Sequence, residues 1–156
     1  MKTQSRAHTS GFTVIELIVV IIILFAAAGL FFYQKNSLQT ASLDERRKTA
    51  INSIYYNLEE VYYPKNGFYP AELTSSNLSA VAPELLVDTN GNKIDDKLDL
   101  SELDEDLQEQ LKDSPAGLSE YVYEPLNCNA AGECKGYTLR VALANESDYI
   151  KKSRRN

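Results

Sequence analysis

The sequence contains no tryptophan, and its single histidine, His8, lies within the first eleven residues. A chain cut after residue 11 would have no imidazole for a Ser-His-Asp or Cys-His catalytic system, nor for a zinc site built on histidine. The sequence also lacks a glycine-rich phosphate-binding loop. We therefore expect no enzyme activity.

Basic residues are too few for a nucleic-acid-binding protein. The 156 residues, enough for one modest domain beside an apolar segment, carry a formal net charge of −6. Residues 1–11 hold Lys2 and Arg6 and no acid, so 14 of the 16 basic residues and all 22 acidic residues follow them. Binding to phosphates needs a basic surface, and we expect no contact with nucleic acid.

Cysteine is scarce as well, since Cys128 and Cys134 are the only two and lie six positions apart. In a cytosolic protein they would be incidental thiols. In an oxidising compartment they would form a disulfide that closes a short loop. A zinc site would need two more ligands, and no suitable pair lies nearby. Because the chain has an apolar membrane segment, we expect the disulfide.

That apolar segment is the strongest positive signal. The 21 residues from Phe12 to Phe32 include one charge, Glu16. At about 1.5 Å per residue, a helix of this length crosses a hydrocarbon core of about 30 Å. Lys2 and Arg6 precede it, which favours a cytoplasmic amino terminus with the rest of the chain outside. A carboxylate inside a bilayer costs about 3 kcal/mol or more, so Glu16 requires an explanation.

Three interpretations of this segment compete. The first is a secretory signal peptide cut after Ala28, although the run is longer than a usual signal core and contains an acid. The second is a plain single-pass anchor that tolerates Glu16 near the interface and tethers a monomeric domain outside the membrane. The third depends on residues 10–17, SGFTVIEL, and gives the acid a function.

These residues resemble the amino-terminal signal of type IV prepilins and type II secretion pseudopilins. In that family a short basic leader ends in glycine, phenylalanine usually follows, and glutamate is fifth in the mature chain; Gly11, Phe12 and Glu16 match. The resemblance implies cleavage after Gly11 by a prepilin peptidase and N-methylation of Phe12. It further implies assembly, by a membrane platform and its ATPase, of this and related subunits into a surface or periplasmic filament. In the filament core, Glu16 would neutralise the Phe12 amine of a neighbouring subunit.

Hydrophobic periodicity predicts that the helix continues beyond the membrane. No proline occurs between Phe12 and Val61, and apolar residues recur at spacings of three and four, at Ile51, Ile54, Tyr55, Leu58, Val61 and Tyr62. The opposite side is expected to face solvent and carries Asp44, Glu45, Arg46, Arg47, Lys48, Glu59 and Glu60. We predict one helix that ends at Pro64 and the Asn66-Gly67 turn, in preference to two helices divided near residue 44.

The rest of the chain predicts a small head domain. Residues 120–125 and 136–144 alternate as two strands, with Tyr121 and Tyr123 on one face and Tyr137, Leu139, Val141 and Leu143 on one face of the partner. Residues 151–156 are basic and predict a solvated tail. The expected fold is α+β, the ladle of the pilin-like family, in which a long helix packs on a small antiparallel sheet. Its parts are a leader (1–11), a transmembrane or filament-core helix (12–33), an amphipathic continuation (34–63), a globular head (64–150) and the tail (151–156).

An acidic stretch after residue 87 is a candidate calcium site. Oxygen-bearing side chains surround Gly91 at Asp88, Asn90, Asn92, Asp95, Asp96 and Asp99, and Ca²⁺ takes about six to eight oxygen ligands. The match to an EF-hand loop is partial, because Lys93 stands at the sixth position and Asp99 at the twelfth. Calcium sites also occur among the pseudopilins that the chain resembles. The alternative is a solvated turn before a helix, and a tethered calcium-binding or sensor domain is the alternative to a filament subunit.

Overall fold

The computed structural model describes residues 13–117 and 119–155. The leader, with Gly11, and the following Phe12 lie outside the described residues. The chain divides into two compact units, Met1–Gln39 and Thr40–Asn156.

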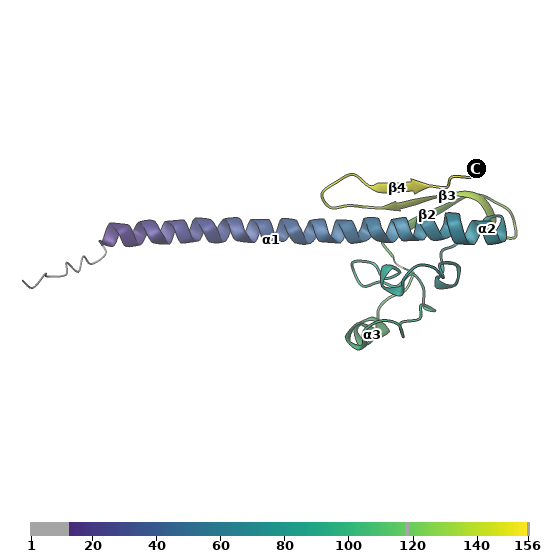
Figure 1. The fold of residues 1–156 in the computed structure, drawn as a ribbon, viewed down its shortest axis with the longest axis horizontal. Helices are drawn as coiled ribbons and strands as arrows, with labels where there is room; N and C mark the ends of the chain where they lie inside the picture. Colours follow the sequence, from purple (N-terminus) through teal and green to yellow (C-terminus); the bar gives the residue numbers. More distant parts are fainter. Residues whose placement is uncertain (1–12, 118, 156) are drawn as a thin grey trace, which may run out of the picture. The chain divides into compact units, whose positions relative to one another are not determined.

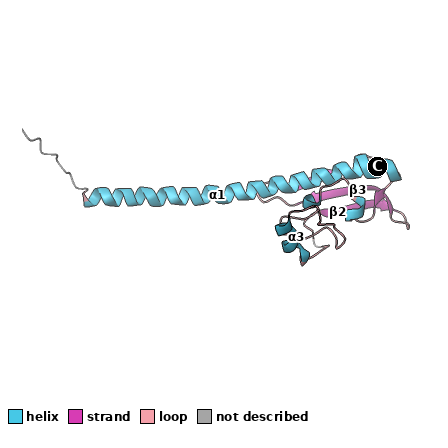
Figure 2. Ribbon diagram, turned by 60° about the horizontal axis from the view of Figure 1, so that its bottom comes forward, coloured by secondary structure: helices cyan, strands magenta, loops and turns pink. Residues whose placement is uncertain are grey.

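One helix, α1, runs without interruption from Val14 to Tyr56 (Figure 1 and Figure 2). Its interior has no proline, and its lone glycine, Gly29, stays helical. The hydroxyl of Thr13 caps the start by accepting a hydrogen bond from the Glu16 amide at 3.3 Å. The prediction of a single long helix is confirmed.

Helical structure continues past α1 to Asn66, three residues beyond the predicted end at residue 63. A π-helical turn (Asn57–Tyr62) leads into the short helix α2 (Tyr63–Asn66). Pro64 lies in the first turn of α2, where its missing N–H is tolerated. The helix ends at Gly67, whose φ of 78° is a left-handed conformation that glycine adopts readily.

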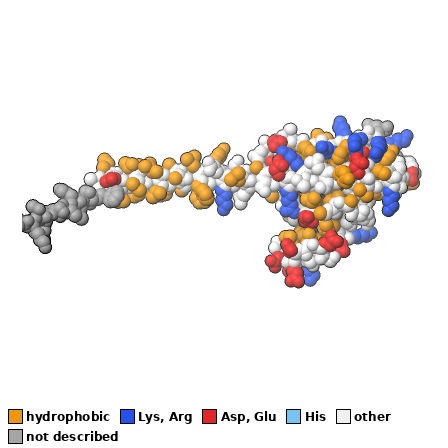
Figure 3. Space-filling view, in the orientation of Figure 1, with side chains coloured by type: hydrophobic (Ala, Val, Ile, Leu, Met, Phe, Trp, Pro, Cys, Tyr) orange, Lys and Arg blue, Asp and Glu red, His pale blue; other side chains and the backbone are white. Residues whose placement is uncertain are grey.

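In the first unit, α1 displays apolar side chains on every side. Each described large hydrophobic residue from Val14 to Tyr33 is exposed, and Figure 3 shows these side chains covering this part of the helix. Within the described residues, α1 and its extension form the one helix that is long and apolar enough to cross a membrane. The expectation of a membrane-spanning segment is consistent with this length and composition.

The second unit is built on an antiparallel sheet of four strands: β1 (Tyr69–Pro70), β2 (Val122–Cys128), β3 (Glu133–Val141) and β4 (Tyr149–Lys152). The long strand β3 is central. It pairs with β2 along one edge and with both β1 and β4 along the other. The α+β prediction, with a long helix and a small antiparallel sheet, is confirmed at this level.

The core lies between the second half of α1 and one face of the sheet. Ala50, Ile51, Ile54 and Leu58 are fully buried, as are Tyr137, Leu139 and Val141 of β3. Burying one such aliphatic side chain contributes about 1.5 to 3 kcal/mol. The predicted inward faces are therefore confirmed for these residues. They are wrong at two positions, because Val61 is exposed and Leu143 lies beyond the end of β3.

A second layer of the core comes from the irregular segment between β1 and β2. It contains two short 3₁₀ helices (Ser75–Asn77 and Pro83–Leu85) and α3 (Glu105–Lys112). Among the described residues of this segment, eight apolar ones are buried: Leu78, Val81, Leu86, Val87, Ile94, Leu98, Leu111 and Tyr121.

The carboxyl-terminal residues do not form the expected solvated tail. Tyr149–Lys152 form β4, whose residues pair in register with Thr138 to Val141 of β3. The Ser153 amide then donates to the Tyr137 carbonyl at 3.0 Å. The basic composition predicted a solvated tail. Strand pairing along the free edge of β3, however, uses backbone groups and does not depend on the charge of side chains that point outward.

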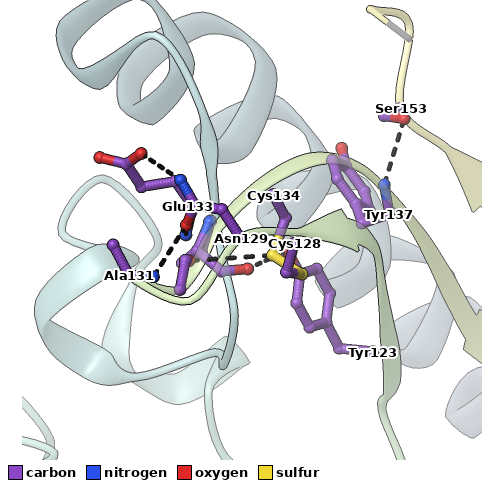
Figure 4. The surroundings of a disulfide bond; sticks show 10 residues. Tyr123, Cys128, Asn129, Ala131, Glu133, Cys134, Tyr137 and Ser153 are labelled. Atoms are coloured by element: carbon purple, nitrogen blue, oxygen red, sulfur yellow. Dashed lines mark hydrogen bonds between the residues drawn. A yellow bond between two sulfur atoms is a disulfide. The ribbon is translucent and has the colours of Figure 1, made fainter.

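The disulfide expected from the sequence is present. Cys128 and Cys134 are opposite each other in the register of β2 and β3, and their sulfurs are bonded (Figure 4). The enclosed turn is organised by Asn129, whose side-chain oxygen accepts from the amides of Ala131 and Glu133 at 3.0 Å each. The bond therefore closes the hairpin that joins the two longest strands.

Replacing both cysteines, Cys128→Ala with Cys134→Ala, should lower the free energy of unfolding by about 2 kcal/mol, because the bridge restricts a short loop in the unfolded chain. Urea unfolding of the full-length chain in detergent, followed by the near-ultraviolet circular dichroism of its tyrosines, measures this difference. Ala130→Ser in the same turn is the control and should change it by less than about 0.5 kcal/mol. An equal effect of the two variants would contradict the role given to the bridge.

Candidate functional site

The exposed apolar part of α1 is the first candidate site. Glu16 is the only charged residue between Thr13 and Gln34. So large an apolar surface is not stable in water and must be covered by lipid or by another protein chain. The carboxylate in its first turn is the single feature that could make such a contact specific.

Glu16 also has a local role that sequence reasoning missed. It stands three residues after the capping Thr13, the S/T-x-x-E spacing of a helix capping box. A carboxylate in the first turn also interacts favourably with the positive end of the helix dipole. The sequence of residues 13–16, TVIE, contained this capping-box spacing. Capping and charge pairing are separable by experiment, since glutamine fits a capping box but carries no charge.

Asp88, the first candidate calcium ligand, is buried with 2 % of its surface exposed. Its Oδ1 accepts from the amides of Asn90 and Asn92 at 2.8 Å each. Its Oδ2 accepts from the Asn92 side chain at 2.9 Å and from the Glu120 amide at 3.0 Å. The carboxylate therefore organises the Gly91 turn and joins it to the residue before β2, using the oxygens that a metal would need.

The other candidate ligands have separate positions and partners. Asp95 Oδ2 accepts from the amide and hydroxyl of Ser75 at 2.7 and 3.0 Å. Asp99 accepts from the Ser101 amide, and this bond lowers the pKa of Asp99. Asp96 lines one cavity together with Asp95 and also borders a second cavity beside Lys93. Within the part of the chain that the structure describes, no group of three His, Cys, Asp or Glu residues is placed to hold a metal. Calcium binding stays a prediction without support from this geometry.

A partly buried ion network joins α1 to the turn around Gly91, on the helix side predicted to face solvent. The Arg47 guanidinium lies 3.0 Å from both Asp44 Oδ1 and Glu120 Oε2, and donates to the Thr89 hydroxyl at 2.8 Å. Asp44 also accepts from the amides of Ala144 and Asn145, and the Ala144 bond leads the causes that lower the pKa of Asp44. The expectation of a solvated polar face is wrong for Asp44 and Arg47.

The expectation of a solvated polar face is also wrong for Glu59, which is completely buried in the π-helical turn. Its Oε1 accepts three hydrogen bonds, from the hydroxyls of Tyr69 and Tyr137 at 3.0 Å each and from the Arg154 amide at 3.1 Å. Burial first, and then the Glu59 carboxylate, raises the pKa of both tyrosines, so their hydroxyls stay protonated as donors. The Arg154 Nε lies 3.5 Å from Glu59 Oε2.

The π-helical turn explains why an arginine is needed here. In this turn the Tyr63 amide donates to the Leu58 carbonyl, five residues back. The next carbonyl, that of Glu59, would take the amide of residue 64, but Pro64 has none. Arg155 Nη1 supplies the missing donor at 2.9 Å. The carboxyl-terminal segment thus completes the hydrogen bonding of the helix end.

The cluster of Glu59, Tyr69, Tyr137, Arg154 and Arg155, termed here the Glu59 clamp, holds four segments of the chain together. It connects the end of the long helix with β1, β3 and the residues after β4. Its chemistry is that of a structural clamp, because its tyrosines serve as donors to a carboxylate that they enclose. No protein-family model, curated protein or solved structure matches the chain.

Glu59→Gln should lower the free energy of unfolding by about 2 to 4 kcal/mol, because it removes the buried charge that the hydroxyls and arginines surround. The neighbouring Glu60, which pairs with Arg154 at the surface, provides the matched control. Glu60→Gln should cost less than about 1 kcal/mol. Urea unfolding of the full-length chain in detergent compares the two, and equal losses would contradict the clamp.

Proposed function

We propose that this chain is a filament subunit of the type IV pilin or type II secretion pseudopilin class. The observation that carries the proposal is the apolar surface of α1 from Val14 to Phe32, exposed throughout and interrupted by one carboxylate, Glu16. The motif that precedes this surface, Gly11 and Phe12 in the sequence, and the small disulfide-braced α+β head support the same conclusion.

The helix would cover its apolar surface in two successive ways. As a membrane anchor it lies in lipid, with Lys2 and Arg6 on the cytoplasmic side and the head outside. In a filament the same surface packs against the helices of other copies or related subunits. Each 100 Å² of apolar area removed from water contributes about 2.5 kcal/mol, but lipid and helix partners are both apolar, so this term does not choose between them.

The charge of Glu16 supplies the preference for partner helices. Cleavage after Gly11 would leave a positive α-amino group on Phe12, four positions before the carboxylate. Either charge alone is costly in an apolar core, whereas the two together are compatible with it. Pairing between neighbouring copies would also set their axial offset. The implied partners are a prepilin peptidase and an assembly platform with its ATPase, and the filament would be periplasmic or at the cell surface.

Two substitutions at Glu16 separate charge pairing from capping. Glu16→Gln keeps a residue that suits the capping box and removes the charge, whereas Glu16→Ala removes both. If pairing is the function, both variants should reduce sheared filament yield roughly tenfold or more, because an unpaired buried ammonium costs several kcal/mol. Both should still fractionate with the membrane.

Val19→Ala, in the same exposed surface, is the control and should assemble at close to the normal yield. Normal assembly of Glu16→Gln together with failure of Glu16→Ala would reduce the acid to a helix cap. Normal assembly of both would contradict the proposal and favour a monomeric tethered domain.

A further inference from the structure

Lys93 is buried without a partner for its charge. The residue is only 9 % exposed, and lysine is almost never buried to this degree unless it is paired. Its backbone is fixed, because its amide donates to the Pro115 carbonyl at 2.9 Å and its carbonyl accepts from the Gly117 amide at 3.1 Å. Its ammonium forms no ion pair or hydrogen bond with any described residue. Such a charge is destabilising unless an anionic group is supplied from outside the described chain.

Lys93 lines a cavity of about 490 Å³ that lies against α3. Pockets for small molecules span about 300 to 1,000 Å³, so this volume is sufficient for one. One face of α3 forms a wall of the cavity, at the spacings of three and four residues that place side chains side by side on a helix. The residues of this wall are Glu105, Gln108, Glu109 and Lys112.

The other charged residues of the cavity are also unpaired. Besides Lys93 there are four, all exposed: Asp96, Glu105, Glu109 and Lys112. None of them forms an ion pair with a described residue, and even Glu109 and Lys112, three positions apart on α3, do not pair. Figure 3 shows acidic side chains gathered over α3. Three acids and two lysines thus border one space without neutralising one another.

These charges select the class of ligand. A simple anion would pair with Lys93 but would be repelled by three carboxylates. A metal ion would be repelled by Lys93, and no group of three acids in the described part of the chain is placed to hold it. An uncharged molecule would leave the buried ammonium unpaired. A small zwitterion suits both charges, because its carboxylate pairs with the lysine and its ammonium with the acids of α3.

The cavity also offers apolar surface for a side chain, since the buried Leu98 and the half-buried Leu100 line it. We propose that the cavity binds a free amino acid with an apolar side chain. Its carboxylate pairs with Lys93 and its α-ammonium with Glu105 and Glu109. The site belongs to the head alone and does not depend on the proposed filament function.

L-Leucine is the probe, titrated by isothermal calorimetry into the full-length chain in detergent. The binding energy that small ligands gain per atom places the expected dissociation constant at about 1 mM or below. Isocaproate, which lacks the ammonium, and isoamylamine, which lacks the carboxylate, should each bind at least about tenfold more weakly, because each leaves one set of charges unpaired. No binding of L-leucine at about 10 mM, or equal binding of either analogue, would overturn the site.

Two variants test the residues that recognise the zwitterion. Lys93→Met keeps an unbranched side chain and removes its charge, and Glu105→Gln with Glu109→Gln removes the acids of α3. Each should weaken L-leucine binding at least about tenfold. Asp106→Asn, at an exposed acid of α3 outside the cavity, is the matched control and should change the affinity less than about twofold.

The stability of the ligand-free Lys93→Met chain separates binding from a structural role. Its free energy of unfolding, measured by urea titration in detergent, should be unchanged or higher, because the substitution removes a buried charge that has no partner. A less stable or unfolded Lys93→Met chain would show that the lysine is structural and would overturn the inference. Normal L-leucine binding by this variant would overturn it as well.

Discussion

The apolar surface of α1 is the constraint on which the rest depends. Every described large hydrophobic side chain from Val14 to Tyr33 is exposed, a state that water does not permit. Lipid can cover such a surface in any orientation. Other helices cover it at a defined axial offset only if a specific interaction fixes that offset. Glu16 is the only side chain in that stretch with the charge to do so. The carboxylate would thus turn a membrane anchor into an assembly element, at the cost of a charge that needs a partner.

In the head, the end of the long helix packs against the sheet, and its polar groups need hydrogen-bond partners there. The π-helical turn and Pro64 leave the Glu59 carbonyl without a helical donor, and burial leaves the Glu59 carboxylate without water. Tyrosine hydroxyls from β1 and β3 and arginines beyond β4 provide the partners. Because Glu59 accepts hydrogen bonds from several segments, including the residues after β4, the carboxyl-terminal segment is part of the folded domain.

Periodicity and composition were sufficient for the regular parts of the molecule. The long helix, its inward Ile51, Ile54 and Leu58, the inward face of β3 and the disulfide follow from local patterns in the sequence. The π-helical turn, β4, the burial of Asp44 and Glu59, the partial burial of Arg47 and the hydrogen bonds that occupy Asp88 do not. Most of these depend on contacts between residues far apart in the chain, such as Arg155 with Glu59 at a separation of 96, whereas Asp88 is held mainly by its neighbours Asn90 and Asn92. From sequence alone, a charged side chain on a helix is predicted to face solvent, because its distant partner is not known. The carboxylate oxygens of Asp88 would likewise suit either a metal ion or a backbone amide.

The most direct test is the intact mass and amino-terminal sequence of the protein taken from its native membrane, with the prepilin peptidase present and absent. A filament subunit must begin at N-methylated Phe12, and only when the peptidase is present, because the freed amine is the partner that Glu16 requires. A chain that still begins at Met1 in both membranes would leave Glu16 unpaired and contradict the proposal. A start at Gly29 would show that the acid is discarded with a signal peptide, and would contradict it equally.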